Sequence, residues 1–261
     1  MQPDIVEFWK RCPLDGPPFV HPDDREEISR RAPGALDELI KSYEGFVQSQ
    51  RFGDFDDYAF HLSLLPAPYL GDLNRARIFL LLLNPGFDMA DYYAEYQVPA
   101  FRQRAAASLN QRFDGVEFPF LFLDPEFSWH GGFGYFERKL RSITQKVARQ
   151  AGVPYLDGLR QLARSLAVLQ MVPYHSAAFR DNWALKLPSA AKARQFACEQ
   201  IYPRAKAGEA IAVILRNGKQ WDAPECPSIV SYTGPLARGA SLGAETPGGK
   251  TILKFLGFTD P

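Results

Sequence analysis

The stretch R-I-F-L-L-L-L-N-P-G-F-D, residues 77–88, decides how the rest of the chain is interpreted. Six apolar residues, Ile78 to Leu83, run without a polar break and end at Asn84-Pro85-Gly86. A short apolar run bounded by turn residues indicates a strand buried on both faces, as in the middle of a parallel sheet. Pro85 has no N–H for a sheet ladder, so the strand must end before it. The sequence therefore places the Asn84 amide at the carboxyl end of a central strand, where open α/β sheets bind ligands.

Three further apolar runs have the length of buried strands and alternate with stretches of helical periodicity. They cover residues 166–172, 210–215 and 229–232. Residues 118–123 are expected to form a short strand, and the clearest helix follows over residues 136–151, with Gly152 as its stop. Strands separated by helices imply β-α-β crossovers. We therefore predict an α/β fold with a four-stranded, mainly parallel sheet flanked by helices.

The first 75 residues differ from the rest because turn signals and helical periodicity dominate them. Residues 1–75 are predicted to form a helical N-terminal extension that packs on an α/β domain over residues 76–261. Apolar residues sharing one face predict a helix over residues 34–47. In the α/β domain, Ser189 is expected to cap a helix that Pro203 closes.

The composition of the 261-residue chain excludes several kinds of site. Its three cysteines lie far apart without a C-x-x-C pair, which argues against a disulfide framework, a zinc ribbon or an iron–sulfur cluster. The four histidines lack metal-ligand spacing, so we expect no metal and no cofactor. The sequence shows no targeting signal and no apolar segment of membrane length, which predicts a cytoplasmic protein without a membrane partner.

The net charge of zero hides a strong asymmetry along the chain. Residues 1–75 contain 8 Lys and Arg against 14 Asp and Glu, whereas residues 127–220 contain 15 against 5. A basic segment with this excess fits a face that binds phosphates. Solvated helix faces explain the same excess equally well, and the sequence leaves both interpretations open.

Polar residues follow the apolar runs at the points where the predicted strands end. They are Asn84, residues 170–175, residues 216–217 and residues 232–233. Because the carboxyl ends of parallel strands meet at one edge, these residues predict a single concave site. The common nucleotide-binding and hydrolase motifs are missing from the sequence.

The segment N-P-G-F-D-M-A-D-Y-Y-A-E-Y-Q-V-P-A-F, residues 84–101, resembles the first active-site motif of the uracil-DNA glycosylase superfamily. The likeness is closest to the single-strand-selective and mismatch-specific branches, in which a strand ends in Asn-Pro-Gly. The order of buried strands over residues 76–240 is also similar to that family's four-stranded parallel sheet. The resemblance implies an enzyme that flips a base out of DNA and hydrolyses its N-glycosidic bond without a metal or cofactor. We expect it to act as a monomer.

The resemblance also implies roles for individual residues. Asn84 would hold and polarise the water that attacks the anomeric carbon. The residues that would contact the extruded base are Phe87, Tyr92, Tyr93, Gln170 and Tyr174. Gln170 ends the second strand, where the family supplies an amide that reads the base edge. Since an asparagine cannot act as a general base, a carboxylate is expected as well. The candidates are Asp88, Asp91, Asp124 and Glu126, with Asp88 favoured because it is nearest to Asn84.

The last motif of the family, His-Pro-Ser-Pro-Leu-Ser, is only partly matched by Y-T-G-P-L-A-R-G over residues 232–239. Tyr232 stands where the family has the histidine that donates to the departing base. His175, beside a strand end, is predicted either to donate in its place or to contact a phosphate, with a structural bond to the backbone as the alternative. Leu236, with Arg238 nearby, is expected to wedge into the vacated base stack, unless it is a packed loop residue.

These departures favour a modified base over plain uracil, as does the insert rich in Phe and Gly over residues 113–135. The superfamily includes a bacterial phage-defence glycosylase that excises glucosylated hydroxymethylcytosine, and the chain is compatible with that role. One alternative is a repair glycosylase for uracil or hypoxanthine. A second is a DNA-binding or sensor protein on the same fold that has lost catalysis. A third is a small-molecule hydrolase that uses the same strand edge.

Overall fold

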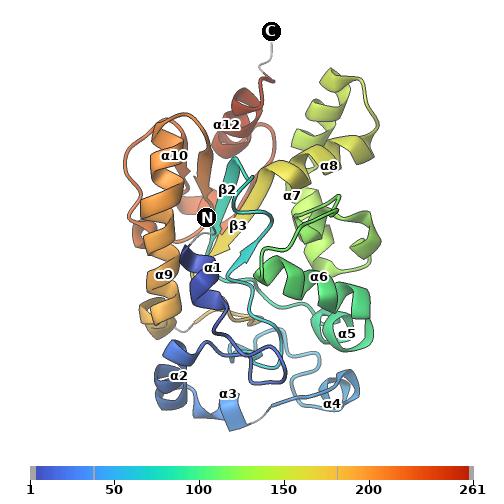
Figure 1. The fold of residues 1–261 in the computed structure, drawn as a ribbon, viewed down its shortest axis with the longest axis vertical. Helices are drawn as coiled ribbons and strands as arrows, with labels where there is room; N and C mark the ends of the chain where they lie inside the picture. The colour runs from blue at the N-terminus through green and yellow to red at the C-terminus, as the bar shows by residue number, and fades with distance from the viewer. Residues whose placement is uncertain (1–3, 38, 181, 259–261) are drawn as a thin grey trace. The chain divides into compact units, whose positions relative to one another are not determined.

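The computed structural model describes residues 4–37, 39–180 and 182–258, and these form a five-stranded sheet with the order β1-β3-β2-β4-β5 (Figure 1). The strands are β1 Tyr69–Leu70, β2 Ile78–Leu82, β3 Leu166–Gln170, β4 Ile211–Ile214 and β5 Ile229–Ser231. β4 runs parallel to both of its neighbours, β2 and β5. The predicted α/β class and the four predicted strands are confirmed. The number of strands is five rather than four, because the two-residue β1 is too short to give an apolar run.

β2 is the strand predicted from the opening stretch, and all of its residues are buried. It lies between β3 and β4 in the sheet. Successive side chains point to opposite faces. Leu80 joins an apolar core with Val168 of β3 and Val213 of β4, whereas Phe79 lies 5.1 Å from the guanidinium of Arg204. Burial on both faces explains why this strand contains no polar residue.

Helices cover both faces of the sheet. α7, Gly131–Ala151, α8, Tyr155–Ser165, and α12, Pro247–Phe255, contribute to the apolar core around Leu80. α10, Tyr202–Lys206, contacts β4 and carries the arginine that lies over Phe79. α7 ends where the sequence predicts, because Gly152 takes the left-handed conformation at φ 66°.

The remaining helical elements are mostly short. In chain order they are α1 Asp4–Trp9, η1 Pro22–Asp24, α2 Arg25–Arg31, α3 Pro33–Asp37, α4 Tyr43–Val47, α5 Ala90–Gln97, α6 Pro99–Leu109, η2 Leu121–Leu123, η3 Pro125–Phe127, η4 Asn182–Lys186, α9 Pro188–Phe196, η5 Ala197–Ile201, η6 Gly218–Trp221 and α11 Gly234–Gly239. Within the described ranges, no helix combines the length and the apolar character that crossing a membrane requires.

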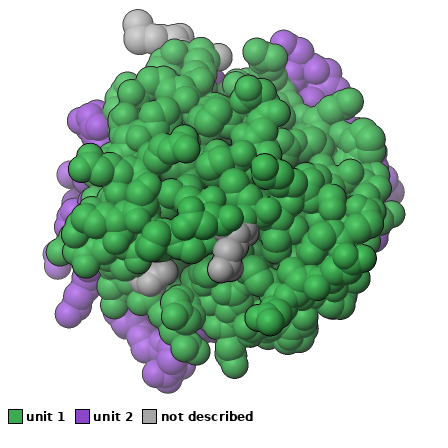
Figure 2. Space-filling view, turned by 90° about the horizontal axis from the view of Figure 1, so that it is seen from below, with its two compact units in different colours: residues 1–69, 83–112, 170–193 green, residues 70–82, 113–169, 194–261 purple. Residues whose placement is uncertain are grey.

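The chain divides into two compact units, each built from three stretches (Figure 2). The first unit comprises residues 1–69, 83–112 and 170–193. The second unit comprises residues 70–82, 113–169 and 194–261, and it contains most of the sheet. Residues 70–75, which the sequence assigns to the N-terminal extension, fall in the second unit. A separate extension followed by an α/β domain therefore stays a prediction.

Four local predictions are wrong for identifiable reasons. Ser189 lies inside α9 and does not cap it, because Asp24 Oδ1 accepts from Ser189 N at 2.9 Å and Ser189 Oγ has no hydrogen-bond partner among the described residues. Residues 118–123 end in the 3-10 turn η2 instead of forming a strand, because Pro119 lacks a ladder donor and the aromatic side chains reach the core from a loop. The helix expected over residues 34–47 is two short helices, and Ser42 caps the second by accepting from Gly45 N at 2.9 Å. Pro203 does not close a helix. It lies in the first turn of α10, where a missing N–H is tolerated, after the π-helical turn η5.

Candidate active site

Asn84 lies two residues beyond the end of β2, and the first unit holds its side chain in place. Val172 N donates to Leu83 O at 2.8 Å, so strand-like pairing continues up to the residue before Asn84. Asn84 Nδ2 donates to Ser176 Oγ at 3.1 Å, and Ser176 is buried. Because Ser176 orients the amide nitrogen, the carbonyl Oδ1 of this half-buried residue has a defined direction as an acceptor. An oxygen held in this way can orient a water molecule, although it cannot take its proton.

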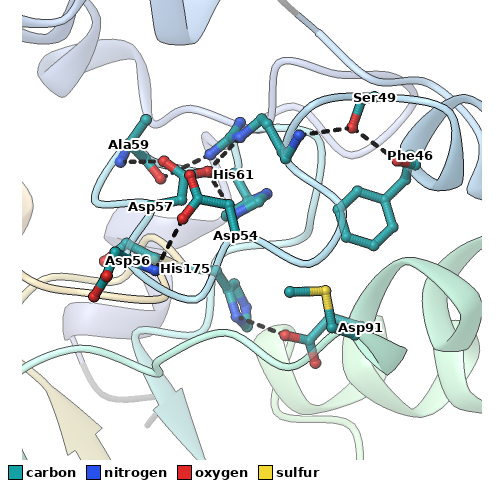
Figure 3. A network of polar contacts seen from close by, with 12 residues as sticks. Phe46, Ser49, Asp54, Asp56, Asp57, Ala59, His61, Asp91 and His175 are labelled. Atoms are coloured by element: carbon teal, nitrogen blue, oxygen red, sulfur yellow. Dashed lines mark hydrogen bonds and ion pairs between the residues drawn. The ribbon is translucent and has the colours of Figure 1, made fainter.

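His175 is held beside the Asn84 turn by two groups of the first unit. Its Nδ1 lies 3.1 Å from Gly86 O. The same atom lies 3.7 Å from Asp91 Oδ2, a pair that is drawn in Figure 3. Gly86 has φ 74°, a conformation that favours glycine. A neutral imidazole that donates from Nδ1 to a carbonyl carries its lone pair on Nε2. Two of the three residues predicted to be catalytic, Asn84 and His175, are thus brought together in one unit.

Asp91 is the carboxylate that faces His175, and Asp88 has a different role. Asp88 is exposed, and its Oδ1 accepts from Ala90 N at 2.8 Å in the first turn of α5. Asp91 is 7% exposed, and its Oδ2 accepts from Asp88 N at 2.8 Å. Helix α5 begins at Ala90, and its first turn brings Asp91 back toward His175 while Asp88 remains at the surface. Proximity to Asn84 in the sequence favours Asp88 as the catalytic carboxylate. The 3.7 Å distance to His175 Nδ1 favours Asp91 instead.

The aromatic residues that follow Asn84 divide into buried and accessible ones. Phe87 stacks on the His61 ring at 3.8 Å with an interplanar angle of 6°, and it keeps part of its surface accessible. Tyr92 is buried and stacks on Phe46 at 4.2 Å, so it belongs to the packing of the first unit. Tyr93 is 43% exposed. Of the three residues predicted to stack on a base, Phe87 and Tyr93 keep an accessible surface.

The buried ring of His61 packs against one face of the Phe87 ring, and the sequence gives no signal for this contact. Its ring is buried, its Nδ1 lies 3.3 Å from Tyr92 Oη, and its Nε2 lies 3.5 Å from Asp57 Oδ2. That last pair is close but does not have hydrogen-bond geometry. Burial, then the charges of Arg51 and His175, lowers the pKa of His61 to about 2, so the ring is neutral. Arg51 instead holds the Asp57 carboxylate, with its Nε 2.5 Å from Oδ2.

Gln170 and Tyr174, both predicted to bind the base, are buried in the first unit. Gln170 Oε1 is buried without a hydrogen-bond partner among the described residues. Such a group costs about 1–3 kcal/mol, so it is suited to a donor that a ligand brings. Tyr174 Oη already donates to Asp24 Oδ2 at 2.6 Å and accepts from His21 N at 3.2 Å. Its hydroxyl therefore has a structural role.

The remaining predicted site residues belong to the second unit. Tyr232 is buried, and its hydroxyl lies 3.0 Å from Thr246 Oγ1 and accepts from Gly248 N at 3.1 Å. Leu236 packs partly against the apolar core, which is the structural alternative considered for it. Arg238 is exposed. Tyr232 thus holds the start of α12 through its hydroxyl group. It does not act as the hydrogen-bond donor that the histidine at this place in the motif would provide.

Two carboxylates that the sequence offered as general bases are also in the second unit. Asp124 Oδ1 accepts from Glu126 N at 3.1 Å and caps the 3-10 turn η3, and the Glu126 side chain is exposed.

Searches of protein-family models, of curated proteins and of solved structures find no match for this chain.

Proposed function

We propose that this chain is a DNA glycosylase that hydrolyses the N-glycosidic bond of a flipped base and leaves an abasic site. The observation that carries the proposal is the Asn84 amide, oriented by Ser176 and placed beside the imidazole of His175. The resemblance of residues 84–101 to the first motif of the uracil-DNA glycosylase superfamily assigns the same residue to the hydrolytic water. An asparagine after a buried strand, a histidine and a buried carboxylate supply the groups that such a hydrolysis needs.

The proposed chemistry divides the work between Asn84 and His175. Asn84 Oδ1 accepts a hydrogen bond from water and directs its oxygen toward the anomeric carbon. As the bond from that carbon to the base nitrogen breaks, a bond from the water oxygen forms, and Nε2 of His175 takes the proton. The departing base leaves with the bonding electron pair and is protonated afterwards. Asp91, 3.7 Å from His175 Nδ1, offsets the positive charge that the imidazole gains. Proton transfer of this kind contributes about 10²–10⁴-fold to a rate.

The choice of a modified base rests on the residues around the site. Tyr232 uses its hydroxyl within the second unit, so it does not replace the family's histidine as a donor to a departing uracil. Gln170 carries a buried acceptor that fits an amino group such as the N4 amine of cytosine. We therefore propose modified cytosine as the substrate class, with glucosylated hydroxymethylcytosine of phage DNA as the candidate. Uracil and hypoxanthine are the alternatives.

The test is a panel of otherwise identical oligonucleotides, each with one uracil, hypoxanthine, hydroxymethylcytosine or glucosylated hydroxymethylcytosine. Alkali cleavage at abasic sites gives the single-turnover rate. We expect cleavage of a modified-cytosine substrate, and a loss of about 10²-fold or more in Asn84→Ala because the water is no longer oriented. Asn74→Ala, at an exposed turn of the second unit, is the matched control. An absence of abasic product from every substrate, or an Asn84→Ala rate equal to that of the wild type, contradicts the proposal.

The structural role of Tyr232 also favours a second candidate, a DNA-binding or sensor protein on the same fold without catalysis. This candidate predicts salt-dependent DNA binding, no abasic product and a DNA affinity that Asn84→Ala leaves unchanged. The same panel, read by binding as well as by cleavage, separates the two functions.

A further inference from the structure

The exposed side of helix α7, in the second unit, carries a row of basic residues. The helix contains five Lys and Arg against one Glu. Arg138 and Arg149 are exposed, and Arg138 Nε makes a long contact of 3.4 Å to Gly134 O. Lys139 Nζ donates to two backbone carbonyls, Gly239 O at 2.7 Å and Ala240 O at 2.8 Å. None of these contacts neutralises the positive charge of the side chain.

Two further arginines lie in the same part of the second unit. Arg216, after β4, donates to Arg238 O at 3.1 Å. Burial, then the charges of Arg216 and Arg138, lowers the pKa of Lys139, which shows that these cations are near one another. We name Arg138, Lys139, Arg149, Arg216 and Arg238 the α7 cationic stripe. Across the part of the chain that the structure describes, no salt bridge joins any of the five to a carboxylate.

The acidic residues near the stripe pair with other cations. Glu137 pairs with Arg141, with 2.7 Å between Arg141 Nη2 and Glu137 Oε2. Glu245 reaches Lys146 at 3.2 Å and Lys250 at 3.7 Å, and its side chain is 76% exposed. Close like charges repel one another unless an anion joins them. The stripe therefore keeps its positive charge among the described residues and attracts anions.

The shape of this surface fits an extended anion. A groove of about 520 Å³ runs beside α7 and is lined by Gln145, Lys146, Arg149, Leu236 and the loop Gly243–Pro247. At about 1.5 Å per residue, α7 extends roughly 21 Å from Tyr135 to Arg149, and one strand of B-DNA carries about six phosphates over that length. Two accessible aromatic residues lie near the start of the helix, Trp129 at 45% and Tyr135 at 36% exposure. Lys139 Nζ lies 4.6 Å from the Tyr135 ring centroid. Cations interleaved with exposed rings are typical of nucleic-acid surfaces.

We infer that the α7 cationic stripe binds the sugar–phosphate backbone of DNA. The choice of DNA as the polyanion rests on the proposed function, whereas the location of the stripe rests on the contacts of the second unit. The arginine side chains contact phosphates, and the groove along α7 holds the strand. Binding of this kind is independent of sequence and depends steeply on salt.

The experiment measures the affinity of the full chain for a labelled 20-nucleotide duplex without modified bases, so that no base is excised. Fluorescence anisotropy is recorded over a range of salt concentrations. We expect Arg138→Ala/Arg149→Ala to bind more weakly and to lower the slope of log K against log salt by about 1.8, since each phosphate contact contributes about 0.9. The matched control is Arg164→Ala/Lys206→Ala, which removes the same charge from exposed sites on α8 and α10 of the same unit. The control is expected to keep the wild-type slope.

Three outcomes overturn the inference: equal slopes for the stripe variant and the wild type, equal losses in both double variants, and binding to phosphatidylserine vesicles without binding to DNA. Far-UV circular dichroism of each variant verifies folding. The outcomes also separate this inference from the proposed function. If no substrate loses a base but the stripe variant still loses DNA affinity, the proposed function is wrong and DNA binding by the stripe is supported. If a base is excised and DNA affinity does not depend on Arg138 and Arg149, DNA binding by the stripe is wrong and the proposed function is supported.

Discussion

The two compact units differ in charge and in what they bury. The first unit contains 13 Lys and Arg against 17 Asp and Glu, a balance of −4, and the second contains 17 against 13, a balance of +4. Both units bury ionisable side chains: His21, Asp24, His61 and Asp91 in the first, and Asp72, Asp124 and His130 in the second. Those of the second accept from backbone N–H groups two residues away, whereas Asp91 and His61 of the first contact His175 and Phe87. The largest core of the second unit is apolar and centres on Leu80 and Val213, and its cationic stripe is at the surface.

This difference indicates what each unit contributes. A buried polar group lowers the stability of the fold unless it is hydrogen-bonded, and the hydrogen bond fixes the orientation of both partners. In the first unit, buried Ser176 orients the Asn84 amide. Asp91 faces His175, and His61 stacks on Phe87. In the second unit, apolar packing supplies stability and leaves the charged side chains available to a partner. We therefore expect mutations at the Asn84 turn and at His175 to affect chemistry, and mutations in the apolar core and the cationic stripe of the second unit to affect folding and DNA affinity.

The largest expected effect tests whether the first unit carries the chemistry. His175→Asn should reduce the single-turnover excision rate by about 10²-fold or more, because the proton acceptor is lost. Asp91→Asn should reduce it less, since it removes only the charge beside Nδ1. The midpoint of urea unfolding should stay close to that of the wild type for Asp91→Asn. A His175→Asn rate equal to that of the wild type would give His175 a structural role only. It would also contradict the assignment of the proton acceptor to the first unit.

The next effect tests whether the second unit supplies the stability. Leu80→Ala removes a fully buried side chain from the apolar core, and we expect it to lower the free energy of unfolding by about 2–5 kcal/mol. Equilibrium denaturation measures this change. Leu156→Ala, at a 43% exposed leucine on α8, is the matched control and should change stability by less than about 0.5 kcal/mol. Similar losses for both variants would contradict an apolar core centred on β2.

The third effect concerns the buried polar contacts of the first unit. Tyr174→Phe removes the hydroxyl that bonds Asp24 and His21 N, and we expect a loss of about 1–3 kcal/mol because both groups stay buried. Tyr58→Phe, at a 51% exposed tyrosine of the same unit, should be nearly neutral. Thermal unfolding of both variants measures the difference. A neutral Tyr174→Phe would mean that these buried polar contacts are not needed for stability.

The smallest effect is a pH dependence in which two groups of the first unit oppose each other. The pKa of His61 is lowered to about 2, so below the ordinary pKa of 6.5 the unfolded chain binds a proton that the folded chain does not. The His61 contribution to stability is therefore lost as the pH falls, by up to about 1.4 kcal/mol per pH unit. Burial raises the pKa of Glu95 to about 7, although Arg102 opposes the shift. Between pH 4.5 and 7 the folded chain therefore binds the extra proton, and the Glu95 contribution rises as the pH falls.

Single variants separate these two contributions. Glu95→Gln should lose stability more steeply than the wild type on acidification from pH 6.5 to 5, because the opposing contribution of Glu95 is removed. His61→Gln should gain stability over the same interval. Urea unfolding at each pH measures both slopes, and parallel slopes for the wild type and both variants would exclude the two groups as the cause.

Much of the fold follows from the sequence because its signals are local. The run Ile78–Leu83 lacks polar residues since β2 is covered on both faces, and the stop of α7 at Gly152 follows from the left-handed conformation that glycine permits. Local signals also explain the errors. Pro203 looks like a helix end, but the π-helical turn before it lets the chain continue into α10. Residues 118–123 have an apolar strand pattern, but they reach the core from a loop.

An amide that follows a buried central strand can be predicted from the sequence, because the strand length, the apolar run and the turn residues are all encoded within a dozen positions. Which side chains surround that amide depends on contacts between distant segments. Ser176 and His175 come from the segment after β3, and His61 from a loop before β1, so folding alone brings them to the Asn84 turn. It also assigned Asp91 rather than Asp88 to His175 and gave Tyr232 a structural partner. The physical reason is that hydrogen bonds and burial act between groups close in space, and sequence separation does not report that distance.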